Sequence, residues 1–199
     1  MVPEPDVVAF VRAALPEPPA RVLEVGAGDG SLAAALRDAG YDVVAIDPAG
    51  EPPVLPVALE DYEDGPRSFD AAVAIVSLHH VSPLTRSLRH LAGLLRRGAV
   101  LVVDEFDGWA LDEDAAAWWL ERSGHDSAPC DLIAGLREHV HPLHAIREAL
   151  SAWFDVGVPV PGAYLYRWKL DRALRGEEEA LIAAGALPAT GARFVAVRR

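Results

Sequence analysis

Three glycines at alternate positions, Gly26, Gly28 and Gly30, separate an apolar run from a segment with helical spacing. Glycine lets the backbone turn tightly and approach a ligand closely, and the helix that follows offers unpaired N–H groups at its start. Asp47 comes 19 residues after Gly28 and ends the next apolar run, where a carboxylate can accept both hydroxyls of a ribose. The spacing predicts one crevice that binds an adenosine-containing cofactor.

The glycine loop fits an NAD site poorly. A dinucleotide fingerprint places its third glycine, or an alanine, at position 31, where this chain has Ser31. Glu24 and Asp29 add negative charge with no lysine nearby, which disfavours a pyrophosphate and suits a ligand with an ammonium and a sulfonium. An NAD-dependent oxidoreductase stays as an alternative, and a mere tight turn is a second one.

Two adjacent histidines, His79 and His80, follow an apolar run at residues 69–76. Histidine titrates near neutrality, so either side chain could take a proton from a hydroxyl or an amine and is a candidate catalytic base. The alternative is that one histidine packs against or caps the next helix while the other faces solvent.

Acidic and aromatic side chains beyond residue 103 are candidates for binding a second substrate. Asp104 and Glu105 end another apolar run and could orient a basic group or bind a divalent ion, although a solvated strand end is an equal alternative. Trp109, Trp118 and Trp119 could form an aromatic wall over the crevice, or simply pack inserted helices together. We predict no metal site.

The elements that must position these residues alternate between apolar runs and helical patterns, which predicts βαβ units and a parallel sheet. Expected strands cover residues 21–25, 42–47, 69–76 and 99–103, with a short or irregular strand near 54–59 among three prolines. Expected helices cover residues 31–39 and 83–95, the second with Ser82 as N-cap and Pro83 at its first position. Such a sheet would bring the candidate residues to its carboxyl edge.

The second half of the chain has a different pattern. Residues 111–152 are helical in composition and predict an inserted segment that covers the site of the second substrate. Residues 154–160 and 193–198 are expected strands, with a helix around 177–184 between them. Tyr164, Tyr166 and Trp168 alternate as on one face of an extended segment.

The motifs around Glu24-x-Gly26-x-Gly28-x-Gly30, Asp47 and residues 69–81 resemble the class I S-adenosylmethionine (SAM)-dependent methyltransferases of the small type 11/12 groups. The resemblance covers residues 20–105. It implies a Rossmann-like, seven-stranded, mostly parallel sheet with helices on both faces and an antiparallel C-terminal strand pair. It also implies a helical insertion after the fifth strand, the one expected at residues 99–103.

The resemblance also implies a role for each motif, with SAM as cofactor. The glycine loop would line the methionyl part, Asp47 would bind the ribose, and Glu60 would bind the adenine amino group, since Ala58 stands where relatives often have an acid. The cofactor-binding residues are then Glu24, Gly26, Ala27, Gly28, Gly30, Ser31, Asp47, Pro48, Glu60, Asp61, Val76 and Ser77. The acceptor-binding residues are Glu105, Trp109 and Trp118.

Bulk composition limits the classes of partner. The 199 residues suit one domain, 1–199, and 30 acids against 18 bases give a net charge of −12, which opposes binding to a phosphate backbone. The lone Cys130, the absence of a basic leader and the absence of a long apolar run predict a cytoplasmic protein without a membrane partner. The expected function is methyl transfer to a small molecule by a monomer or homodimer, and the alternative is a SAM-binding regulatory module.

Overall fold

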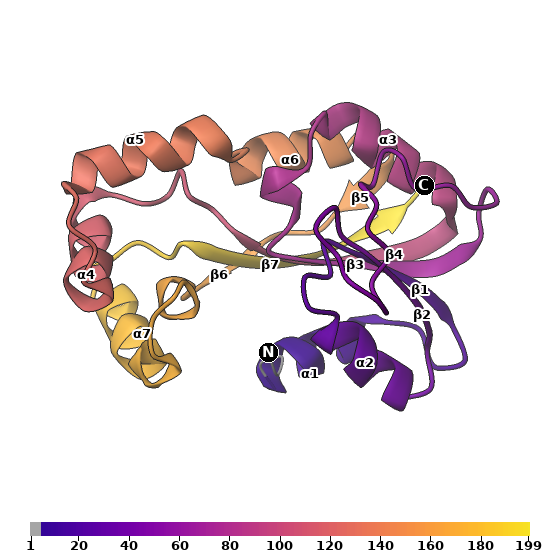
Figure 1. The fold of residues 1–199 in the computed structure, drawn as a ribbon, viewed down its shortest axis with the longest axis horizontal. Helices are drawn as coiled ribbons and strands as arrows, with labels where there is room; N and C mark the ends of the chain where they lie inside the picture. The colour runs from indigo at the N-terminus through magenta and orange to yellow at the C-terminus, as the bar shows by residue number, and fades with distance from the viewer. Residues whose placement is uncertain (1–4) are drawn as a thin grey trace.

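A computed structural model describes residues 5–199 as one open α/β sheet with helices on both faces and a helical lobe at one end (Figure 1). Residues 1–4, which form the start of the expected leaderless N-terminus, lie outside the described part. The strands are β1 (Arg21–Val25), β2 (Asp42–Ile46), β3 (Phe69–Ile75), β4 (Leu95–Phe106), β5 (Phe154–Val156), β6 (Val160–Gly162) and β7 (Gly191–Arg198).

The sheet has the order β2-β1-β3-β4-β7-β5, with β6 also paired to β7. The pairs among β1 to β4 are parallel, and β7 runs antiparallel to β4, β5 and β6. The predicted Rossmann-like sheet of seven strands with an antiparallel C-terminal part is therefore confirmed. The order reverses between β1 and β3, and ligands of open α/β sheets bind at such a point.

Two helices cover each face of the sheet, and the remaining ones form the lobe. The α-helices are α1 (Pro5–Ala14), α2 (Ser31–Asp38), α3 (Leu84–Leu94), α4 (Glu113–Ser123), α5 (Pro129–His139), α6 (Leu143–Leu150) and α7 (Arg175–Ala183). Short 3₁₀ turns are η1 (Leu78–His80), η2 (Leu165–Arg167) and η3 (Arg172–Leu174). Among residues 5–199, no helix combines the length and apolar character needed to cross a bilayer.

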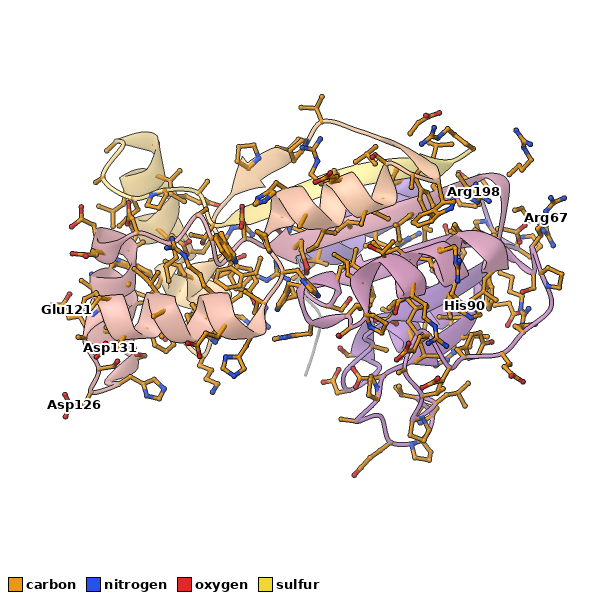
Figure 2. The ribbon with its side chains drawn as sticks, turned by 90° about the horizontal axis from the view of Figure 1, so that it is seen from above. Arg67, His90, Glu121, Asp126, Asp131 and Arg198 are labelled. Carbon is orange, nitrogen blue, oxygen red and sulfur yellow. The ribbon has the colours of Figure 1, made fainter. Side chains whose placement is uncertain are left out.

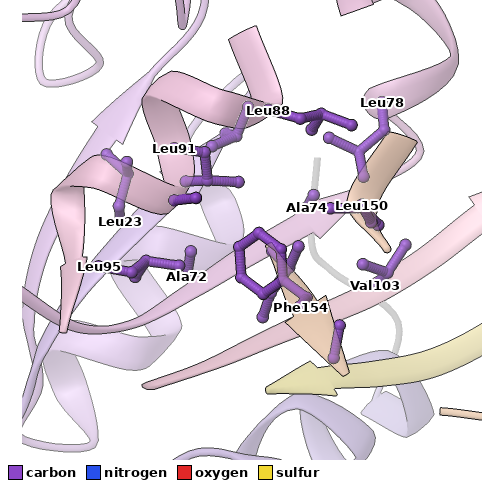
Figure 3. Close-up of a cluster of buried hydrophobic side chains, with 14 of the residues drawn as sticks. Leu23, Ala72, Ala74, Leu78, Leu88, Leu91, Leu95, Val103, Leu150 and Phe154 are labelled. Carbon is purple, nitrogen blue, oxygen red and sulfur yellow. The ribbon is translucent and has the colours of Figure 1, made fainter. Parts of the chain in front are cut away.

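The largest core lies between the sheet and the pair α3 and α6 (Figure 3). Leu88 and Leu91 of α3, Leu150 of α6 and Phe154 of β5 are fully buried against the sheet there. A second cluster joins α1 and α2 to the opposite face, and a third holds α4, α5 and η2 together. Of the three helices within residues 111–152, only α4 and α5 therefore belong to the lobe, because α6 packs on α3.

Several sequence expectations for individual elements are wrong in detail. The irregular strand near 54–59 is reduced to a single bridge between Ile46 and Leu55, because the prolines around it lack the N–H groups that a ladder needs. Ser82 does not cap α3, which begins at Leu84 after Pro83 in an extended conformation. The N-terminal helix α1 had no counterpart among the expected elements.

The C-terminal region also departs from the expectation. The strand expected over 154–160 divides into β5 and β6, since Gly157 lies between them and donates its N–H to Val195 O at 2.9 Å. A Cβ at Gly157 would stand 2.7 Å from that oxygen, so only glycine allows this approach. Tyr164, Tyr166 and Trp168 do not alternate on an extended segment, because η2 turns the chain there.

Candidate functional site

The glycine loop joins β1 to α2 at the carboxyl edge of the sheet. Gly26, Gly28 and Gly30 all have positive φ angles, of 69°, 54° and 72°, a conformation that L side chains rarely adopt. A Cβ at Gly26 would lie 2.3 Å from Ser77 Cβ, so this glycine also lets the loop approach the end of β3. No atom lies within 4 Å of a Cβ placed at Gly28, which leaves space beside the loop.

Asp47 directly follows β2 and faces the glycine loop. Its Oδ2 accepts a hydrogen bond of 2.9 Å from Gly28 N, and its Oδ1 accepts one of 2.9 Å from Ala49 N. Parallel pairing of Val25 with Ile46 places the ends of β1 and β2 side by side, which brings the two motifs together. The crevice predicted from their spacing therefore has both of its elements in place.

Two cavities lie along this edge and share Gly26 and Val76. The first, of about 340 Å³, is lined by Val25, Gly26, Ile46, Asp47, Pro48, Ala49, Val57, Leu59, Glu60, Val76, Ser77, His80, Val81, Ser82 and Ser87. The second, of about 400 Å³, is lined by Val7, Glu24, Gly26, Ala27, Gly28, Asp29, Ser31, Leu32, Ile75, Val76, Tyr164, Arg167 and Arg172. We call them the Asp47 cavity and the Glu24 cavity.

Most of the expected cofactor residues line one cavity or both. Gly30 and Asp61 line neither, although Gly30 is needed for the turn because a Cβ there would meet Val54 Cγ2 at 2.7 Å. Glu60 lines the Asp47 cavity as expected and lies 3.7 Å from the guanidinium of Arg86. The roles of these residues toward a ligand stay predictions.

Glu24 is a buried acid whose charge lacks a full set of partners. Its Oε2 is buried without a hydrogen bond, and burial raises the pKa of this carboxyl to about 8, although the charge of Arg37 and a backbone group of Ala33 oppose the rise. A carboxylate in this position gains stabilisation from any cation that enters the Glu24 cavity. Glu24 is therefore suited to receive an ammonium group.

Val76 connects the two cavities through a strained backbone. Its φ of 53° is unusual for a β-branched residue. Its N–H donates to Asp104 O at 2.7 Å, which ties the end of β3 to β4, while its side chain packs against the core of the lobe. Such strain concentrates at functional sites.

His79 forms a buried pair with Glu105. Its Nδ1 lies 3.0 Å from each carboxylate oxygen of Glu105. Burial raises the pKa of Glu105, although the hydrogen bonds and charge of His79 oppose the rise. If Nδ1 carries the proton shared with Glu105, the basic nitrogen of His79 is Nε2. Neither residue lines the two cavities, so Glu105 contacts a histidine here and not an open site.

His80 stands at the crevice itself. It lines the Asp47 cavity, and its ring lies 4.1 Å from the ring of His79. Burial lowers the pKa of His80, and the neighbouring imidazoles of His79, His139 and His141 lower it further, although a backbone group of His139 opposes this. His80 is thus kept neutral and able to accept a proton at physiological pH.

The two expected acceptor-binding tryptophans lie away from both cavities. Trp118 is buried in the lobe, where its Nε1 donates to Glu177 at 3.1 Å and Arg122 covers its ring at 4.5 Å. Trp109 is 44% exposed, and Arg137 of α5 lies 5.3 Å from its ring centre. The structure brings neither ring to the glycine loop, and packing within the lobe accounts for Trp118.

Sequence reasoning missed the arginines of the Glu24 cavity. Arg167 and Arg172 come from the turn between β6 and α7, and no motif marks them. Tyr164 beside them was singled out only as one of three alternating aromatics, yet it lines the cavity and stacks on Phe106 at 4.5 Å.

Asp104 is the centre of an ion-pair network beneath these residues. The buried carboxylate accepts from Arg167 Nη1 at 3.0 and 3.1 Å and from Arg193 Nε at 3.0 Å. Arg193 continues the network to Asp6 of α1 at 3.1 Å. The solvated strand end considered as an alternative for Asp104 is therefore wrong. Among residues 5–199, no group of three acidic, histidine or cysteine side chains is placed to hold a metal ion.

A glycine loop, an acid at the end of the next strand and a cavity at the reversal of strand order define a Rossmann-like nucleoside-binding protein. Residues 5–152 match the model of a family described as a methyltransferase domain. An uncharacterised methyltransferase of Mycobacterium tuberculosis is 33% identical over 176 residues, which cover 77% of this chain and 84% of the relative. The chain belongs to the methyltransferase domain family, which confirms the resemblance seen in its motifs.

Solved structures of methyltransferases share the fold. An S-adenosylmethionine-dependent methyltransferase of Mesorhizobium loti superposes with a TM-score of 0.62 at 17% identity, covering 94% of this chain and 95% of the other. A 1,6-didemethyltoxoflavin-N1-methyltransferase of Burkholderia thailandensis, with its substrate and S-adenosylhomocysteine bound, has a TM-score of 0.59 at 17% identity, covering 98% and 77%. The chain spans only 37% to 49% of the length of three other curated relatives.

Proposed function

We propose that this protein is a SAM-dependent methyltransferase that acts on a small molecule. The observation that carries the proposal is the pair of cavities joined at Gly26 and Val76, with Asp47 in one and the unpartnered Glu24 Oε2 in the other. The family match and the use of SAM and its demethylated product by structural neighbours support it.

The residues present fit SAM. Asp47 offers two carboxylate oxygens at the loop, as a ribose diol requires, and the space beside Gly28 lets a ligand approach the backbone. Glu24 offers a buried carboxyl group whose charged form an ammonium group would stabilise. When bound, SAM supplies an electrophilic methyl group on its sulfonium.

The protein's own contribution is then to align, to exclude water and to accept a proton. We infer that the lobe of α4 and α5 covers the acceptor side, since Phe106 at the end of β4 and Tyr164 of the Glu24 cavity both pack in its core. A net charge of −12 disfavours a nucleic-acid acceptor, and acidic side chains such as Glu121, Asp126 and Asp131 occupy the far end of the lobe (Figure 2).

Replacing Asp47 with alanine tests the cofactor site. The change removes a charged acceptor from the crevice, so the affinity for both SAM and S-adenosylhomocysteine should fall roughly 10- to 100-fold. Calorimetric titration measures this, with Asp126→Ala in the distant lobe as a control of equal charge change. Unchanged affinity in Asp47→Ala, or a wild-type protein that binds neither ligand, would contradict the proposal.

The histidine pair is inferred to accept the proton that the acceptor loses. Glu105 fixes Nδ1 of His79 and leaves Nε2 as its base, while His80 lines the cavity in a neutral state. With an acceptor found in a panel of small hydroxyl and amine compounds, His80→Gln should lower kcat roughly 100-fold or more and remove the acidic limb of the pH profile, because His80 lines the Asp47 cavity and His79 lines neither cavity.

His79→Gln is the matched comparison. If His79 is the base instead, the loss of kcat moves to His79→Gln, and His80→Gln then leaves kcat nearly unchanged. Full activity in both variants would show that the pair accepts no proton. A panel in which SAM is bound but never consumed would favour a SAM-binding regulatory module.

A further inference from the structure

A histidine outside both cavities holds the turn that carries the histidine pair. His141 lies in the link between α5 and α6, and its backbone N–H donates to His79 O at 2.9 Å. Its side-chain Nε2 lies 3.0 Å from Val81 O, and Nε2 is the donor in this bond because a carbonyl oxygen only accepts. His141 is half-buried and lines neither cavity, so the proposed function assigns it no role.

The two hydrogen bonds from His141 lie on either side of His80. They fix the carbonyl groups of the residues directly before and after it, so the backbone of His80 is held at both ends. Within η1, His80 N donates to Ser77 O and Val81 N donates to Leu78 O, each at 3.1 Å. Hydrogen bonds in a 3₁₀ turn have poor geometry, so the place of this single turn depends on contacts from other elements.

Glu105 of β4 supplies another of these contacts. Its Oε2 accepts from His79 N at 3.3 Å, in addition to the pairing of its carboxylate with the ring of His79. Glu105 therefore fixes the start of the turn. His141 acts further along, because its side chain reaches past His80 to Val81.

The link that carries His141 is itself fastened to the segment after β4. Val140 is buried, and its carbonyl accepts from Trp109 Nε1 at 3.4 Å. At the start of α6, Leu143 N donates to Asp107 Oδ1 at 3.5 Å. Trp109 thus helps to hold the link, and a fixed link is what His141 needs in order to fix η1.

We propose that His141 is a positioning residue, which holds His80 and the adjoining wall of the Asp47 cavity in place by binding the carbonyl groups of His79 and Val81. That wall is formed by Val76, Ser77, His80, Val81 and Ser82. A proton acceptor must lie within hydrogen-bond reach of its partner, and a displacement of about 1 Å can lower a rate roughly 100-fold. This inference rests on the proposed function.

The test compares two substitutions that both remove the imidazole. His141→Gln keeps an N–H group that can donate to Val81 O, whereas His141→Leu fills similar space without a donor. Calorimetry should show that His141→Leu binds S-adenosylhomocysteine roughly 3- to 10-fold more weakly than the wild type, the loss expected for one hydrogen bond that holds the cavity wall. His141→Gln should bind it within about 2-fold of the wild type, because the bond is restored.

The ring of His80 reports its own position in the same two variants. Burial lowers the pKa of His80, so a turn released toward solvent should give a higher pKa in His141→Leu than in His141→Gln. His79 and His139, which also face His80, are the same in both variants, and neither variant has the charge of His141. An NMR titration of the imidazole Cε1–H signal measures this pKa, and the signal is assigned by its loss in His80→Gln.

His144→Leu is the matched control. It removes an imidazole from α6 at an exposed residue that lines neither cavity. It should leave the affinity for S-adenosylhomocysteine and the pKa of His80 unchanged. Should circular dichroism show that His141→Leu does not fold, His141→Asn takes its place, because the amide of asparagine is one methylene shorter than that of glutamine and falls short of Val81 O.

The outcomes separate this inference from the function on which it rests. If His141→Leu and His141→Gln have equal affinities for S-adenosylhomocysteine, or give His80 equal pKa values, the positioning role is overturned and the cofactor assignment stands. A wild-type protein that does not bind S-adenosylhomocysteine would overturn the proposed function itself.

Discussion

The difference in resistance to denaturant between Glu24→Gln and the wild type should shift in favour of Glu24→Gln between pH 5 and pH 8. Burial raises the pKa of Glu24 from 4.5 to about 8 in the folded protein. Between these values the unfolded chain releases a proton that the folded protein keeps, so wild-type stability falls as pH rises, by about 1.4 kcal/mol per pH unit at most. The decline ends above pH 8, and glutamine has no proton to lose.

The measurement is the urea midpoint of the two proteins between pH 4.5 and pH 9, with the slope of the transition checked to be equal. A buried glutamine costs roughly 1 to 3 kcal/mol if one of its groups is unpaired, but this cost is the same at every pH. The divergence of the curves with pH therefore isolates Glu24 from other titrating groups, including Glu105. The exposed change Glu51→Gln should give a curve parallel to the wild type, and parallel curves for Glu24→Gln would contradict the expectation.

The same substitution should weaken cofactor binding, so Glu24 stabilises the complex at the expense of the free protein. An unpaired buried acid is tolerated when it gains a partner on binding, and a ligand that binds only the folded state adds stability in proportion to its concentration. We therefore expect saturating S-adenosylhomocysteine to raise the melting temperature of the wild type more than that of Glu24→Gln at pH 8.

The closeness of the glycine loop and Asp47 could be predicted from sequence because short segments determine it. Gly26 and Asp47 belong to one βαβ unit, and the parallel register that pairs Val25 with Ile46 makes their loops neighbours. Once the unit is recognised, its handedness and pairing leave little freedom for where the carboxylate lies. The prolines near residue 54 are also visible in the sequence, and they explain why the strand expected at 54–59 was predicted to be short or irregular.

The arginines that line the Glu24 cavity could not be predicted, because contacts between distant segments bring them there. Glu177, Glu178 and Glu179 are identical in type, and only the packing of α7 decides that Glu178 is buried beneath the turn while Glu177 contacts Trp118. Likewise, no local pattern pairs Glu105 with His79 across two strands. Trp118 shows the opposite error. As a tryptophan it suggested an aromatic wall over the crevice, but the structure buries it in the core of the lobe.

Asp104→Ala should be the most destabilising of the substitutions considered. The carboxylate is 2% exposed, and its loss leaves Arg167 and Arg193 without a shared partner in a largely buried setting. Removing one member of a buried charge network costs about 3 to 5 kcal/mol, because the remaining charges stay desolvated.

Chemical denaturation at pH 7 measures the effect of Asp104→Ala, and Asp155→Ala supplies the matched comparison. Asp155 also pairs with an arginine, Arg199, but its side chain is 76% exposed, so its removal should cost no more than about 1 kcal/mol. Similar losses for the two variants would mean that burial does not strengthen the Asp104 network. Because Asp104 pairs with Arg193 of β7 and also orients Arg167, which lines the Glu24 cavity, a large loss would connect the stability of this sheet edge to the shape of that cavity.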